Sequence, residues 1–197
     1  TINGLGGLNG VYDANGPNGA RILFISGYDG TNFDSDIPLA IDLPTSGLFE
    51  YKRIVDVRRY ATARDQAAII YDAINKDVVT FAGACCGDGP VYAYHTADTQ
   101  KLRVTDTTPT WRDAGSDMAP IGREVTSSIY DSKSGSEKMV TCFGLVTIKR
   151  MNDCWALSLP TSGRSKWTNL NASGTFPGVR WAAPAVYDDL NDRMVVF

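Results

Sequence analysis

The chain has 197 residues, of which 43% are hydrophobic and 21% charged, a composition typical of a folded protein with a substantial core. Its formal net charge is -3 and its Lys and Arg residues are scattered, which argues against nucleic acid as a partner. No apolar run is long enough to span a bilayer, so we expect no membrane insertion, and the opening Thr1 suggests a mature or excised piece.

Four β-rich runs are expected in the first part of the chain. Residues 8–13 (LNGVYD) and 21–27 (RILFISG) flank a polar turn, which predicts a β-hairpin. Residues 38–43 (PLAIDL) and 50–55 (EYKRIV) predict a third and a fourth strand. The pentapeptide LPTSG at 43–47 lies between them, and its Pro and Gly favour a tight turn.

The same order of runs returns along the chain and is marked by a repeated Tyr-Asp pair. The pair occurs at Tyr12-Asp13, Tyr71-Asp72, Tyr130-Asp131 and Tyr187-Asp188, with spacings of 59, 59 and 57 residues. The expected strands are 67–72, 77–83, 99–104 and 110–115, then 126–131, 138–144, 154–159 and 166–171, then 183–188 and 193–197. The Ala-rich segment 61–76 could pass for a helix on propensity alone, but the repeat favours a strand there.

These observations predict an all-β protein built from four-stranded units. We expect one partial domain over residues 1–197, with repeats at about 5–63, 64–122, 123–179 and an incomplete fourth at 180–197. Tandem units of four short antiparallel strands match the blades of a β-propeller. About three and a half such blades would form part of a larger ring, which predicts that the chain is a fragment.

Particular residues also resemble a family. A Gly closes each complete second strand (Gly27, Gly83, Gly144), an aromatic residue opens the fourth, and the sequences PIGR at 120–123 and PGVR at 177–180 lead into the third and fourth units. In these features the chain resembles the Kelch-repeat, galactose-oxidase-like propellers, most clearly in its third and fourth repeats. The resemblance implies that the loops between second and third strands share one face and form a binding surface.

Three such loops contain the candidate binding residues. In the first loop they are Tyr28, Asp29, Asn32, Asp34 and Asp36; in the second, Tyr92, Tyr94 and His95; in the third, Lys149 and Arg150. The acidic loop could bind Ca²⁺ but lacks EF-hand spacing, so we expect solvated turn carboxylates and no metal. The tyrosines could stack on a sugar or a peptide, or pack against a neighbouring unit.

An arginine stands seven residues before the second, third and fourth Tyr of the repeat. These residues are Arg64, Arg123 and Arg180, whereas Leu5 holds the place in the first unit. Their shared position predicts hydrogen bonds to the connections between units. An anion site would form instead if they converged on a central channel.

Cysteines and a sequon bear on the compartment. Cys85, Cys86, Cys142 and Cys154 allow three pairings, and Cys142 and Cys154 could face each other across one strand pair. Buried free thiols are the alternative. Asn171-Ala172-Ser173 is a possible N-glycosylation site. Together these features favour a secreted or cell-surface glycoprotein with disulfides.

The function expected from the sequence is protein or glycan binding without catalysis. His95 is the only histidine, and no Ser has the context of a nucleophile. No cofactor is expected. The alternatives are a galactose-oxidase-like enzyme, whose two copper-binding histidines and Tyr–Cys pair would lie in other blades, and a structural subunit of an extracellular assembly. The remaining propeller or another subunit is then a further expected partner.

Overall fold

The computed structural model describes residues 7–25, 27–28, 33–34, 39–54, 64–85, 94–106, 108–115, 117–133, 135–175 and 177–197. It describes the backbone alone at Tyr28, Phe33, Asp34, Glu50, Tyr51, Arg53 and Tyr94. All regular elements in these ranges are β-strands, and the predicted all-β class is confirmed there.

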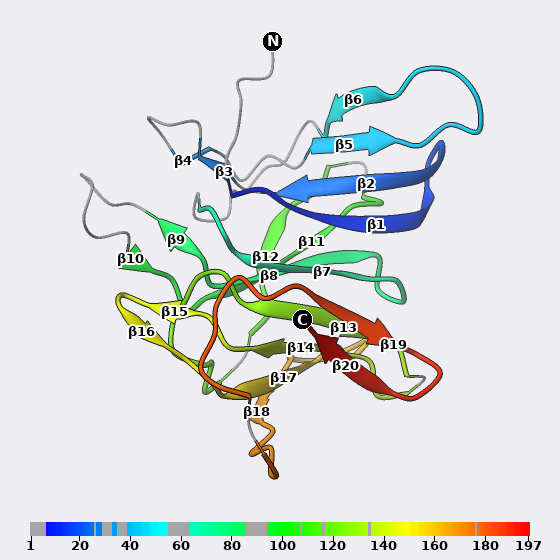
Figure 1. The fold of residues 1–197 in the computed structure, drawn as a ribbon. Helices are drawn as coiled ribbons and strands as arrows, with labels where there is room; N and C mark the ends of the chain where they lie inside the picture. Colours follow the sequence, from blue (N-terminus) through cyan, green and yellow to red (C-terminus); the bar gives the residue numbers. More distant parts are fainter. Residues whose placement is uncertain are drawn as a thin grey trace.

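Three antiparallel four-stranded sheets follow one another along the chain (Figure 1). Sheet 1 contains β1 (Asn9–Gly16), β2 (Gly19–Ile25), β5 (Leu39–Asp42) and β6 (Glu50–Arg53). Sheet 2 contains β7 (Ala68–Asp72), β8 (Asp77–Phe81), β11 (Thr99–Arg103) and β12 (Trp111–Asp113). Sheet 3 contains β13 (Ser127–Asp131), β14 (Lys138–Cys142), β17 (Cys154–Ser158) and β18 (Trp167–Asn169). The terminal hairpin, β19 (Ala185–Asp188) and β20 (Arg193–Val196), completes the described strands of this kind.

Three two-stranded hairpins lie between the second and third strands of the sheets. They are β3 (Gly27–Tyr28) with β4 (Phe33–Asp34), β9 (Ala84–Cys85) with β10 (Tyr94–His95), and β15 (Leu145–Val146) with β16 (Lys149–Arg150). We call them the edge hairpins. The sequence led us to expect irregular loops here, but each connection pairs with itself. Both LPTSG segments lie in turns between third and fourth strands, as predicted.

The Asp of the repeated Tyr-Asp pair shapes the turn that follows each first strand. The side chains of Asp13, Asp72 and Asp131 accept hydrogen bonds from the backbone amides of Asn15, Ile74 and Lys133, at 3.0, 3.1 and 3.0 Å. Carboxylates that accept from amides two residues ahead stabilise tight turns. In the terminal hairpin, Asp188 accepts from Asn191, three residues ahead. The repeated Asp therefore sets the hairpins that carry the strand pattern.

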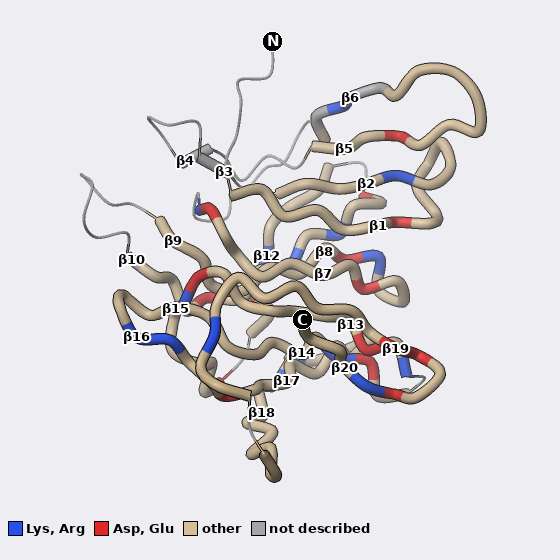
Figure 2. Tube along the Cα trace, viewed as in Figure 1, with Lys and Arg blue, Asp and Glu red and all other residues tan. Residues whose placement is uncertain are grey.

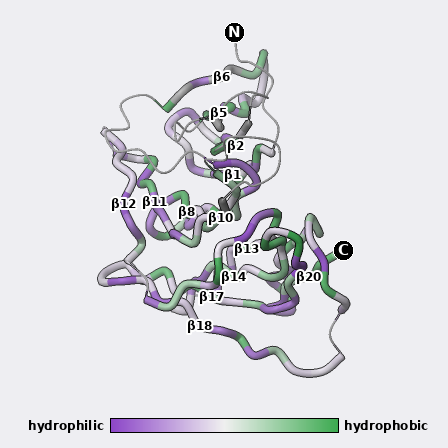
Figure 3. The backbone as a smooth tube through the Cα atoms, turned by 90° about the vertical axis from the view of Figure 1, so that its left-hand side faces the viewer, coloured by the Kyte–Doolittle hydropathy of each residue, from purple (hydrophilic) through white to green (hydrophobic). Residues whose placement is uncertain are grey.

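The core lies between successive sheets. Between sheets 1 and 2 it contains Leu23, Ile25, Tyr71, Leu102 and Trp111 among others; between sheets 2 and 3 it contains Val79, Phe81, Met139, Leu157 and Trp167. Seen from the side of the edge hairpins, the fourth strands β12 and β18 lie outermost (Figure 3). Trp111 and Trp167, which open the fourth strands β12 and β18, therefore bury large apolar surfaces between sheets.

A line of backbone hydrogen bonds also runs across the sheets. The amide of Gln66 donates to Gly7, that of Val125 to Gln66, and that of Ala182 to Val125, at 3.0, 3.0 and 2.9 Å. All four residues have a positive φ, of 68° at Gly7, 52° at Gln66, 48° at Val125 and 51° at Ala182. We call this line the inner belt; it lies before the first strand of each unit and joins consecutive units directly.

Candidate functional site

The three edge hairpins project from one edge of the molecule. In Figure 1 they all lie on the left, whereas the turns after β1, β7, β13 and β19 lie on the right. The connections that the sequence nominated for binding are thus brought to one side. We therefore take the edge hairpins and the residues that hold them as the candidate binding site.

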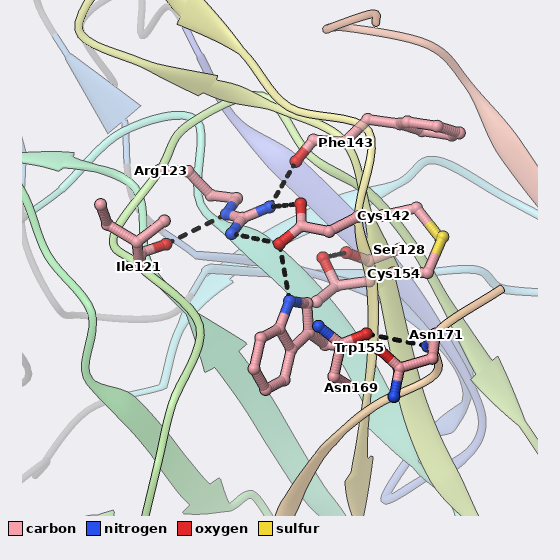
Figure 4. Close-up of polar contacts among 11 residues, drawn as sticks. Ile121, Arg123, Ser128, Cys142, Phe143, Cys154, Trp155, Asn169 and Asn171 are labelled. Carbon is pink, nitrogen blue, oxygen red and sulfur yellow. Dashed lines mark hydrogen bonds and ion pairs between the residues drawn. A yellow bond between two sulfur atoms is a disulfide. The ribbon is translucent and has the colours of Figure 1, made fainter. Parts of the chain in front are cut away.

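Two buried arginines anchor the ends of the second and third edge hairpins. Arg123 donates to both carboxylate oxygens of Asp153, at 2.5 and 3.0 Å, to the Phe143 carbonyl at 3.1 Å, and through Nε to the Ile121 carbonyl (Figure 4). The Arg123 side chain is 2% exposed. Asp153 also accepts from Trp155 Nε1 at 2.7 Å. A two-pronged ion pair of this kind fixes direction as well as distance, so both ends of the β15–β16 connection are held rigidly.

Arg64 makes the same arrangement one unit earlier. Its guanidinium donates to both oxygens of Asp98, at 2.9 and 2.7 Å, and to the Ala82 carbonyl at 2.9 Å. The charge of each arginine alters the acidity of its partner. Burial raises the pKa of Asp98 and Asp153, but the hydrogen bonds and charge of Arg64 and Arg123 outweigh it, so the pKa of both carboxyls lies below the usual value.

The arginine backbones also join neighbouring units. The amide of Gly27 donates to Arg64, that of Gly83 to Arg123 and that of Gly144 to Arg180, at 3.0, 2.8 and 3.2 Å. Each of these bonds joins the end of a second strand to the start of the next unit, at the position of the repeated arginine. Arg64 and Arg123 do not converge as an open anion site, because each is satisfied by a carboxylate of its own unit.

Arg180 differs from the other two. Its Nε donates to the Gly178 carbonyl at 3.2 Å, as Arg123 Nε does to Ile121, and its guanidinium carbon lies 5.6 Å from the centre of the Phe143 ring. No carboxylate of the described residues contacts it. The Arg180 guanidinium is thus oriented like its equivalents but without their ion pair in the described part of the chain.

His95 connects the second edge hairpin to the third. Its Nε2 lies 3.6 Å from Glu124 Oε2, and its Nδ1 accepts from the amide of Thr147, at the tip of β15–β16, at 3.4 Å. Nε2 thus faces the Glu124 carboxylate, while Nδ1 faces the Thr147 amide. His95 therefore holds the tip of the neighbouring hairpin against the start of sheet 3.

Two carboxylates lie at the base of these hairpins. Asp65 bridges to Ala84, which pairs with His95, and Glu124 bridges to Leu145, which pairs with Arg150. Burial raises the pKa of Asp65. Burial also raises the pKa of Glu124, where the charge of His95 opposes and that of Asp65 adds to the effect. These positions were not singled out from the sequence, although each immediately follows a repeated Arg.

The β15–β16 tip presents an apolar residue beside two cations. Ile148 is 91% exposed, and Lys149 and Arg150 are exposed next to it. Both cations belong to the predicted binding residues, and Figure 2 shows them as the basic segment of β16 at the hairpin edge. An exposed aliphatic side chain flanked by positive charge suits contact with an acidic, partly apolar surface.

The other predicted binding residues are described only in part. His95, Lys149 and Arg150 lie together at the second and third edge hairpins. The backbone places Tyr28 and Asp34 in the first edge hairpin and Tyr94 in the second. Asp29, Asn32, Asp36 and Tyr92 lie outside the described residues, so their predicted role in binding remains a prediction.

The cysteines show one disulfide. Cys142 and Cys154 face each other in the register of β14 and β17 and are joined by a disulfide bond, as one of the predicted pairings had it (Figure 4). Cys85 is buried in β9, and Cys86 lies outside the described residues. Asn171 follows β18, and its backbone amide donates to Asn169 Oδ1 at 2.8 Å. Because Asn171 is exposed, the side chain of the sequon is accessible to modification.

Comparisons with other proteins do not place the chain in a family. No protein-family model matches it, and a search of curated proteins finds no significant match. In the described part of the chain, no group of three metal-ligating side chains comes together, and no helix long and apolar enough to cross a membrane is present.

Proposed function

We propose that this chain is a non-catalytic module of the Kelch-type β-propeller class that binds a protein ligand through its edge hairpins, on a secreted or cell-surface protein. In this proposal, sheets 1 to 3 are blades, and the terminal hairpin is the inner half of another. The supporting features are the repeated first-to-fourth strand order and the packing of each sheet on the next. The cross-strand disulfide favours an oxidising compartment.

One observation carries the binding proposal: all three second-to-third connections fold as hairpins at the same edge (Figure 1). Two are anchored by buried ion pairs, and two are linked through His95. Rigid loops lose little conformational entropy on binding, which favours recognition. The exposed Ile148 with Lys149 and Arg150 suits an acidic protein surface better than a neutral sugar.

Binding can be tested with one variant at each edge of the molecule. Ile148 at the β15–β16 tip and Leu190 at the β19–β20 turn are 91% and 92% exposed, so Ile148→Asp and Leu190→Asp make a matched pair. The labelled protein is applied to an array of extracellular protein domains and an array of oligosaccharides. We expect protein ligands whose binding is lost with Ile148→Asp and kept with Leu190→Asp.

Other results would redirect the proposal. Signals on oligosaccharides alone that depend on Ile148 would replace the protein ligand with a glycan. Binding that survives Ile148→Asp, and also survives loss of both cations in Lys149→Gln with Arg150→Gln, would reject the edge hairpins as the binding surface.

A further inference from the structure

The face of sheet 3 that points to the terminal hairpin is only partly covered. Its inner part, with Ile129, Val140 and Phe143, packs against β19 and β20. Farther out, a groove of about 520 Å³ remains over β14, β17 and β18. The residues that define it here are Lys138, Ala156, Ser158, Lys166, Thr168 and Leu170.

The equivalent face of sheet 2 shows how such a groove is filled. There, Trp167 of β18 packs 4.8 Å, between ring centres, from Phe81, and its Nε1 donates to Thr99 Oγ1 at 3.0 Å. In the register of sheet 3, the disulfide-bonded Cys142 and Cys154 hold the places of Phe81 and Thr99. The groove therefore lies where the outer strands of a following sheet would pack.

The edge of β20 provides backbone groups for the same occupant. In sheets 1 to 3 the second strand pairs on both sides, for example β14 with β13 and with β17. Among the described residues, β20 pairs with β19 alone. Unpaired amides and carbonyls along a strand edge accept an added strand.

Arg180 provides a charge at the end of this edge. It has the local geometry of Arg123, which binds the Asp that precedes the third strand of its own unit. In both complete cases the Asp stands one residue before the third strand, as Asp98 before β11 and Asp153 before β17. An Asp at the same place of an added strand would meet the Arg180 guanidinium.

We propose that the β20 edge, the groove and Arg180 together bind one kind of partner: a two-stranded antiparallel segment with an Asp before its first strand and an aromatic residue opening its second. Its first strand pairs with β20, its Asp forms an ion pair with Arg180, and its aromatic side chain packs on the Cys142–Cys154 disulfide. A Leu four residues after the Asp would face Met194, as Leu157 faces Met139.

The residues that this partner requires define a sequence pattern. In this chain the two segments with it begin DTQKL at 98–102 and DCWAL at 153–157, each followed by a turn and a Trp. A second copy of the chain does not fit, because its own third and fourth strands are already paired inside sheets 1 to 3. The occupant is therefore a segment held by no other sheet.

The test uses a peptide with the sequence of residues 152–170 and Cys154→Ser, labelled for fluorescence anisotropy. We expect saturable binding to the intact protein and new protection of β20 amides from hydrogen exchange. Asp153→Asn in the peptide should weaken binding roughly tenfold or more, since a charge-assisted ion pair is lost. Arg180→Gln in the protein should do the same, and the two changes together should cost little more than one.

Two controls accompany the test. Lys149→Gln in the protein removes a cation at the edge hairpins and should leave peptide binding unchanged, which separates this surface from the one proposed for ligand binding. The peptide sequence joined after Phe197 by a Gly/Ser linker of about ten residues raises its effective concentration. It should protect the β20 amides in the wild-type protein and less so with Arg180→Gln.

Defined results would overturn the proposal. One is no protection of β20 by either the free peptide at about 1 mM or the tethered one. Another is a peptide affinity that changes with neither Asp153→Asn nor Arg180→Gln. A dimer by sedimentation, with β20 already protected in the protein alone, would assign this surface to a second copy of the chain.

Discussion

Arg123 binds both carboxylate oxygens of Asp153 through its guanidinium, and its backbone carbonyl accepts a hydrogen bond from the amide of Gly83. One residue therefore fixes the end of an edge hairpin in its own unit and the end of a strand in the previous one. The side chain is nearly inaccessible, whereas that of Asp153 is 25% exposed. An ion pair in this setting is sensitive to the loss of one partner.

Removing either buried arginine should strongly destabilise the protein. Arg123→Met leaves Asp153 without its partner in a largely buried place, and we expect a loss of about 3–5 kcal/mol in the free energy of unfolding. Arg180→Met, which removes an arginine with no carboxylate among the described residues, should cost about 1 kcal/mol or less. Urea denaturation followed by tryptophan fluorescence measures both, and equal losses would contradict the assigned difference.

The contributions of the Asp153 and Glu124 carboxyls to the free energy of unfolding should change with pH in opposite directions. The folded-state pKa of Asp153 is lowered, so its stabilising contribution is present above its unfolded pKa of about 3.8 and is lost as the pH falls through the folded value. The difference in unfolding free energy between wild type and Asp153→Asn should therefore shrink as the solution is acidified below about pH 4.

Glu124 should show the reverse dependence. Burial raises its folded-state pKa above the ordinary 4.5, so the carboxyl favours folding most at low pH and loses that contribution as the pH rises through the folded value. Glu124→Gln should gain stability relative to wild type as the pH increases from about 4 to 7. Denaturation at several pH values measures this, and a parallel trend for Glu124→Gln and Asp153→Asn would disprove the assignment.

The Cys142–Cys154 disulfide should contribute to stability. It closes a loop with a sequence separation of 12 residues, and cross-links of this length stabilise by about 2–3 kcal/mol. The double variant Cys142→Ala with Cys154→Ala should unfold at lower denaturant concentration by that amount. Reductant should lower the stability of the wild type towards the variant; a variant that responds equally to reductant would show that another disulfide carries the effect.

Two glycines with similar backbone angles should differ in their tolerance of alanine. Gly144 and Gly163 have φ values of 102° and 89°, so a side chain is strained at both. A Cβ at Gly144 would lie 2.8 Å from the Glu124 carbonyl oxygen, whereas nothing lies within 4 Å at Gly163. We expect Gly163→Ala to cost about 1 kcal/mol and Gly144→Ala at least twice as much. Thermal unfolding measures both losses of stability, and equal losses would mean that backbone strain at positive φ, and not the contact of the added Cβ, sets the cost.

The repeat in the sequence predicted the strands well because equivalent residues have the same structural role in each unit. Tyr12-Asp13 and its equivalents were recognised from their spacing, and they do set the hairpins. The spacing did not reveal that a Tyr serves the neighbouring unit: Tyr130 Oη lies 3.4 Å from Asp72 Oδ1 of sheet 2, a hydrogen bond between repeats. The spacing of a repeat does not show which of its residues contact the neighbouring repeat.

The site was predicted less completely, for a similar reason. The repeated arginines stood out at a constant distance before each Tyr, but their partners follow at 34 residues in one unit and 30 in the next. The edge hairpins between them differ in length, so Asp98 and Asp153 fall out of register with the repeat. In the first unit Leu5 replaces the Arg, and Ile37, two residues before β5, holds the place of the Asp in the sequence.

The inner belt has a consequence for how the protein loses its structure. Because Val125 donates to Gln66 and Ala182 donates to Val125, each unit completes the backbone bonding of its neighbour. A unit that opened alone would leave its neighbour with an unpaired amide or carbonyl, which adds a cost to every boundary between folded and unfolded units. The units should therefore unfold in one concerted transition, and the amides of Val125 and Ala182 should exchange with solvent at the same rate as the strands beside them.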